Sequence, residues 1–258
     1  MTDINYNKVK EELQNKNLYD IQKGLTLQRQ TRTGVMSLLL FALLFTFVFG
    51  TLENPFLYTL SNIGNFFTYR IVFIIWSIVC GLAIEVAVVS LFKLENYHSK
   101  YCYTFLGLGT FFLIATGVIP ALKDVYPFWH IVHTATSGLL AVFLYLALVP
   151  FSRNVSKENP RLRNIITIWQ IIIWVGSILM IVFYRRSAMF EIWFFASNIV
   201  FLLYLGLVLF EEKIIKISVK LMSDEENLNL AIEKIFVDLD IMKKREERNK
   251  SNKLKIEH

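Results

Sequence analysis

Six apolar stretches, each long enough to cross a lipid bilayer, constrain this chain more than any other feature of its sequence. A helix needs about 20 apolar residues to cross roughly 30 Å of hydrocarbon. Windows of that kind cover residues 35–54, 70–92, 102–122, 128–150, 164–184 and 190–210. Because lipid offers no partner to backbone amides, each window must satisfy its own hydrogen bonds as a helix. The sequence therefore predicts an all-α fold, a polytopic membrane bundle of six transmembrane helices.

The charged residues agree with this layout and exclude a nucleic-acid-binding domain. The chain has a formal net charge of +6, but its basic residues flank the apolar windows and do not gather on one folded face. Cys80 lies inside one apolar window and Cys102 at the start of the next, so neither is placed to meet a partner in an oxidising compartment. The sequence predicts no structural disulfide.

The distribution of Lys and Arg predicts the orientation of the bundle. With six crossings, the two termini and the connections 93–101 and 151–163 share one side of the membrane. That side carries most of the basic residues near the spans: Lys8, Lys10, Lys16, Lys23, Arg29, Arg32, Lys93, Lys100, Arg153, Lys157, Arg161, Arg163, Lys213, Lys216 and Lys220. The other side carries Arg70, Lys123, Arg185 and Arg186. The positive-inside rule then predicts a multi-pass plasma-membrane protein with cytoplasmic N and C termini.

Three parts of the chain follow from these windows: a cytoplasmic segment 1–34, a transmembrane domain 35–212 and a cytoplasmic helix with a basic tail, 213–258. We expect an amphipathic helix at each cytoplasmic end. In the tail, Ser223 to Glu226 has the pattern of a capping box. Apolar residues then recur at alternating steps of four and three: Leu228, Ile232, Ile235, Leu239 and Met242. This seam, residues 228–242, would pack on the N-terminal segment or the membrane surface, or bind a second copy or a protein partner as a coiled coil.

Polar residues at membrane depth are the main candidates for function, because each is costly there unless it faces a cavity or a partner. Those near the outer side of the predicted bundle are Ser61, Asn62, Arg70, His130, His133, Glu191 and Asn198. The two histidines are three residues apart, and Glu191 and Asn198 are seven apart, so each pair lies on one helix face. We therefore predict an outward-facing polar pocket that binds a lipid headgroup or a partner. The alternative is an interfacial belt with Tyr126, Trp129 and Trp193.

Two other functions are compatible with particular residues. His130 and His133 would suit zinc in a membrane lipid hydrolase, although Asp124 or Glu191 would have to supply a third ligand. Glu85, an intramembrane carboxylate, would serve a small-solute transporter or bond to Gln170 as structural glue. The sequence favours a non-enzymatic protein that contacts membrane lipids, with no catalytic residues, metal or cofactor assigned.

Three short motifs resemble a known family. They are SNIG at residues 61–64, GVIP at residues 117–120 and HIVHTATSG at residues 130–138. Residues 35–212 resemble the bacterial six-helix membrane family of unknown function numbered nine-nine-eight, which is distantly similar to the Frag and DRAM membrane proteins. Ser61, Asn62 and His130 match its outer-loop pair and the histidine that opens its fourth helix, with Asn62 where an acidic residue is often found. The resemblance implies an architecture and no activity.

Overall fold

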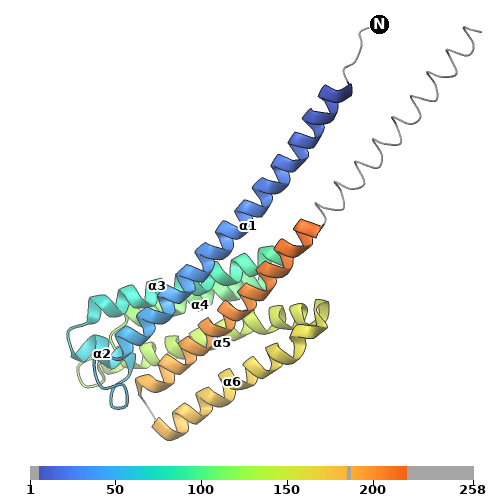
Figure 1. The fold of residues 1–258 in the computed structure, drawn as a ribbon. Helices are drawn as coiled ribbons and strands as arrows, with labels where there is room; N and C mark the ends of the chain where they lie inside the picture. The colour runs from blue at the N-terminus through green and yellow to red at the C-terminus, as the bar shows by residue number, and fades with distance from the viewer. Residues whose placement is uncertain (1–5, 185–186, 220–258) are drawn as a thin grey trace, which may run out of the picture. The chain divides into compact units, whose positions relative to one another are not determined.

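The structure is a computed structural model that describes residues 6–184 and 187–219. Within these residues every regular element is a helix. The labelled helices are α1 (Tyr6–Gly50), α2 (Leu60–Phe66), α3 (Arg70–Leu94), α4 (Lys100–Val118), α5 (Pro127–Glu158) and α6 (Pro160–Tyr184). A further helix, called here the last helix, covers Ala188–Val219 (Figure 1).

Six of these helices are long and apolar enough to cross a membrane: Lys23–Gly50 within α1, then α3, α4, α5, α6 and the last helix. The predicted all-α, six-span fold of an integral membrane protein is confirmed. The chain forms two compact units, residues 28–211 and residues 1–27 with 212–258. The first unit contains most of each span and is the bundle described below. In the second, Lys216 Nζ lies 2.7 Å from Glu212 Oε1, one helical turn away.

The structure differs from the predicted boundaries at two helices. The first span is continuous with the segment before it, because α1 runs from Tyr6 to Gly50 without a break at residue 34. The fourth span does not end at Pro150, although proline removes one backbone hydrogen bond. Beyond it, Phe151 is fully buried against Phe92 and Tyr97, and this packing holds the last turns of α5 in place.

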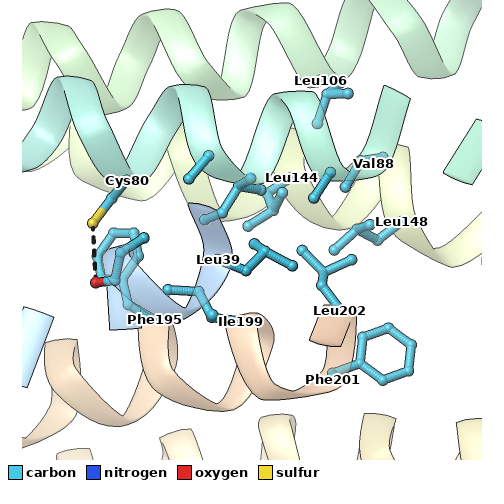
Figure 2. Packing of buried hydrophobic residues seen from close by; sticks show 14 of the residues in the cluster. Leu39, Cys80, Val88, Leu106, Leu144, Leu148, Phe195, Ile199, Phe201 and Leu202 are labelled. Carbon is cyan, nitrogen blue, oxygen red and sulfur yellow. Dashed lines mark hydrogen bonds between the residues drawn. The ribbon is translucent and has the colours of Figure 1, made fainter. Parts of the chain in front are cut away.

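The core of the bundle is formed where α1, α3 and the last helix meet. Phe49 and Phe73 stack against each other at 5.7 Å between ring centroids, and Trp76 stacks against both. Trp76 Nε1 donates to Thr46 Oγ1 at 3.1 Å, and Thr46 Oγ1 lies 3.4 Å from Cys80 Sγ. Both cysteines of the chain are free and buried. Figure 2 shows part of the buried cluster, with Cys80 and Phe195 near one edge and aliphatic residues such as Leu39 and Leu202 beside them.

Small residues allow α4 to approach its neighbours closely. A Cβ atom on Gly117 would lie 2.7 Å from the Cβ of Ser77 on α3, and one on Gly109 would lie 3.4 Å from the backbone nitrogen of Leu144 on α5. Lipid chains are as apolar as the helix side chains, so helices in a membrane associate mainly through van der Waals packing. Close approach of their backbones increases this packing. Close packing between complementary helix surfaces therefore stabilises the bundle.

Candidate functional site

One end of the bundle, called here the loop end, contains residues 51–69, residues 119–126 and Ser187 with the start of the last helix at Ala188 (Figure 1). The short helix α2 organises it. Thr59 is the N-cap of α2, and its Oγ1 accepts a hydrogen bond from Asn62 N at 3.0 Å. The same hydroxyl lies 2.9 Å from Ser61 Oγ. This cap places Ser61 and Asn62 in the first turn of a helix, where the sequence had predicted a loop.

The last helix is joined to the first connection by backbone and side-chain hydrogen bonds. Ala188 N donates to Tyr58 O at 2.6 Å, and Met189 N donates to Pro55 O at 3.3 Å. Glu191 Oε2 accepts from Leu60 N at 2.5 Å, so its carboxyl group caps a free amide in the first turn of α2. Glu191 is thereby fixed at the loop end and close to Ser61.

The two histidines of α5 are held by the connection between α4 and α5. His130 Nδ1 lies 3.0 Å from Ala121 O, and His133 Nδ1 lies 3.0 Å from Ile119 O. A carbonyl oxygen can only accept, so each ring carries its proton on Nδ1. In the neutral form of His130, the other ring nitrogen, Nε2, is then an acceptor. His133 is buried, whereas His130 is half-buried.

Arg70 has a structural position at this end. Its guanidinium donates to Asn65 Oδ1 and to Val118 O. Asn65 Nδ2 in turn donates to Ser61 O at 2.7 Å. Arg70 therefore joins α2, the start of α3 and the end of α4.

A polar cavity of about 560 Å³ lies between α2, the start of α5 and the start of the last helix. The predicted residues that line it are Ser61, Asn62, His130, His133 and Glu191. The structure adds Thr134, Ser137 and Ser187, which sequence reasoning did not assign to a pocket. Thr134 and Ser137 are four and seven residues after His130, so helical spacing alone would have found them. Ser187 has no periodic signal, because it precedes its helix.

An apolar cavity of about 330 Å³ adjoins the polar one. The two share the residues Ser61, Thr134, Ser137, Phe190 and Glu191. Away from these residues the apolar cavity is lined by core side chains, including Phe73, Trp76 and Phe195. Trp76 and Phe195 meet edge to face, with ring centroids 5.0 Å apart. The combined space therefore passes from a polar region to an apolar one across Ser61 and Glu191.

Three of the predicted residues line neither cavity: Arg70, whose contacts are given above, Asn198 and Glu85. Asn198 lines a separate space of about 20 Å³ together with Gln170, and its Nδ2 donates to Phe194 O at 2.8 Å. Seven residues are two helical turns, about 10 Å along the axis, so sharing a face with Glu191 does not bring Asn198 to the same depth. Glu85 is half-buried on α3 and lines none of these three cavities.

The metal hypothesis requires a third ligand close to His130 and His133. In residues 6–184 and 187–219, no three His, Cys, Asp or Glu side chains form a group that could hold a metal ion. His130 and His133 both direct Nδ1 at backbone carbonyls, and Glu191 binds a backbone amide. These contacts position the side chains as the lining of a cavity.

Comparison with known proteins gave no relative: no family model matches the chain, and no curated protein or solved structure does either.

Proposed function

We propose that this integral membrane protein binds a membrane lipid at the loop end without catalysing a reaction. The lipid headgroup lies in the polar cavity, and one of its hydrocarbon chains enters the apolar cavity. The observation that carries the proposal is the set of lining residues common to both cavities, with Ser61 and Glu191 at the change from polar to apolar lining. An amphiphilic ligand matches both sides of that change.

The sizes of the two cavities support a ligand of this class. Small-molecule sites in proteins are typically about 300–1,000 Å³, and the polar and apolar cavities, at about 560 and 330 Å³, both fall in that range. Thr134 and Gly138 line the apolar cavity and are exposed on a membrane-spanning helix. A hydrocarbon chain could therefore enter sideways between α5 and the last helix without leaving the bilayer.

The lipid hydrolase and the transporter have less support. A hydrolase would need a third metal ligand beside the two histidines, and the described residues do not bring one to them. A transporter would need a path through the bundle, and the two adjoining cavities run from the loop end to the core without including Glu85. Lipid binding requires neither feature.

We also propose that the protein lies in the plasma membrane with the loop end outside. Its relation to the nine-nine-eight family, which its motifs resemble, is part of the same proposal. The excess of Lys and Arg at the opposite end of the bundle supports this orientation. Reporter domains fused after Asn159 and after Val219 should then report the cytoplasm, and one inserted after Asp124 should report the outside. The reverse pattern would place the cavities on the cytoplasmic side.

A pair of glycine substitutions tests lipid binding. Gly138 lines the apolar cavity, and a Cβ atom there meets nothing within 4 Å, so Gly138→Leu fills the cavity without disturbing the fold. Gly107→Leu on α4 is the matched control, because a Cβ there is equally free and the residue lines none of the described cavities. Native mass spectrometry of the purified protein should show a bound lipid in the wild type and in Gly107→Leu, and its loss in Gly138→Leu. Equal lipid occupancy in the two variants, or none in the wild type, would contradict the proposal.

A further inference from the structure

The polar cavity contains two groups that each have an atom left to accept a hydrogen bond from a ligand. His130 commits Nδ1–H to Ala121 O, and this is the only hydrogen bond of its ring among the described residues, so its neutral Nε2 is an acceptor. Glu191 uses Oε2 for Leu60 N, which leaves Oε1 for a ligand. The described lining residues include no Lys, Arg or Trp, the residues whose side chains can only donate through N–H groups. A ligand that brings hydrogen-bond donors to this part of the cavity therefore matches these two acceptors.

Thr134 and Ser137 already donate to backbone carbonyls, but three other polar groups of the cavity have hydrogens to offer a ligand. Ser187 is 1% exposed, and its hydroxyl is buried without a hydrogen-bond partner in the described structure. Such a group is costly unless something pairs with it. Ser61 supplies a second hydroxyl and Asn62 a side-chain amide. These three groups could donate to an anionic oxygen of the same ligand.

From these contacts we infer that the ligand is a lipid with a primary ammonium beside its phosphate, as in phosphatidylethanolamine. This inference rests on the proposed function, because it specifies the headgroup of the lipid bound there. The ammonium donates to Glu191 and His130, and a positive charge beside Glu191 favours the ionised carboxylate. The phosphate accepts from Ser187, Ser61 and Asn62. The hydrocarbon chain continues past Ser61 into the apolar cavity.

Lipids that differ only in the headgroup give the direct test. The wild-type protein is placed in nanodiscs of a neutral carrier lipid, and a labelled ligand is titrated at about pH 8, where free imidazole is neutral. Three ligands share the same chains and carry ethanolamine, choline or glycerol after the phosphate. Choline keeps the positive charge but has no N–H donor. We expect the ethanolamine lipid to bind at least about tenfold more tightly than the choline lipid.

Two variants with a matched control locate the effect. Glu191→Gln keeps an oxygen that can accept from Leu60 N and removes the charge. His130→Leu removes the acceptor, and His98→Leu controls for it, because exposed His98 also binds a backbone carbonyl, Asn96 O, through Nδ1 but lines none of the described cavities. We expect Glu191→Gln and His130→Leu each to reduce the preference for ethanolamine over choline by about tenfold. His98→Leu should retain it.

The outcomes separate this inference from the proposed function. If all three lipids bind equally and Gly138→Leu still abolishes binding, the cavity holds a lipid without recognising an amine, and the inference is wrong. Tighter binding of the glycerol lipid would also overturn it, because an anionic headgroup without an amine would then be preferred. If no lipid binds, the proposed function itself fails.

Discussion

The helices α3 and α6 have nearly the same apolar character but very different surroundings. Both contain 25 residues, with mean hydropathies of 2.6 and 2.4 in their most apolar stretches. Half of that stretch is buried in α3, compared with 17% in α6. Hydropathy therefore locates a span without telling whether it faces protein or lipid, because both surroundings accept apolar side chains equally well.

Small and weakly polar residues distinguish the two helices. The buried face of α3 includes Ser77, Cys80, Gly81, Ala83 and Ala87 at helical spacing. In α6 the buried residues are Leu162, Ile166, Ile173 and Ser177. Small side chains let neighbouring backbones approach, which is the main source of packing energy between helices in lipid. A stripe of small residues is therefore a better sign of a central helix than its hydropathy.

The largest expected contrast comes from replacing one tryptophan on each helix by alanine. Trp76 on α3 is 2% exposed and packs against Phe49, Phe73 and Phe195. Trp76→Ala should lower the free energy of unfolding in detergent by about 3 kcal/mol, because it leaves a cavity that the core cannot close. Trp174 on α6 is 42% exposed and has one edge contact, with Tyr145. Trp174→Ala should cost about 1 kcal/mol or less. Equal losses would show that α6 is as tightly packed as α3.

A second contrast changes sign between two glycines of α4. Gly117 faces α3, where an added Cβ would clash with Ser77, whereas Gly107 faces open space. Alanine is about 1 kcal/mol more favourable than glycine within a helix. Gly107→Ala should therefore raise the temperature of unfolding, and Gly117→Ala should lower it. Stabilisation by both substitutions would mean that α3 and α4 can separate at little cost.

The smallest expected contrast concerns hydroxyl groups. Thr46 accepts from Trp76 Nε1 inside the core, while Thr167 on α6 is exposed and donates to Arg163 O in its own helix. Thr46→Val should cost about 1 kcal/mol, because it leaves the indole N–H buried without a partner. Thr167→Val should change stability by less than about 0.5 kcal/mol. Chemical unfolding of both variants, each compared with the wild type, measures the difference.

The six-helix fold could be predicted from sequence because the bilayer requires long apolar windows and each window must form its own helix. Boundaries could not be predicted as well, since they depend on contacts between distant residues. Phe151 meets Phe92 and keeps α5 helical past Pro150, and Glu191 caps α2 although the two are far apart in the sequence. Neither contact leaves a local pattern in the sequence.

The candidate site, like the fold, could be predicted from the sequence only in part. Spacing along α5 placed His130 and His133 on one face, and the structure adds Thr134 and Ser137 from that helix. The depth of each side chain in the bundle was harder to predict, because it depends on where each helix begins. Asn198 lies too deep in the last helix to line the polar cavity. The seam predicted over 228–242, with its capping box, lies outside the described residues and stays a prediction.

The hydrogen bond between Glu191 and Leu60 also has a consequence for biosynthesis. The two residues are 131 positions apart, and a chain is made from its N-terminus. Leu60 is therefore synthesised well before the ribosome reaches its partner, and the amide group that begins α2 waits for the last span to be inserted. The cavity can close into its final shape only when translation of that span is complete. A chain truncated before Ser187 would keep five apolar spans and an unfinished loop end, a difference that membrane quality control could recognise.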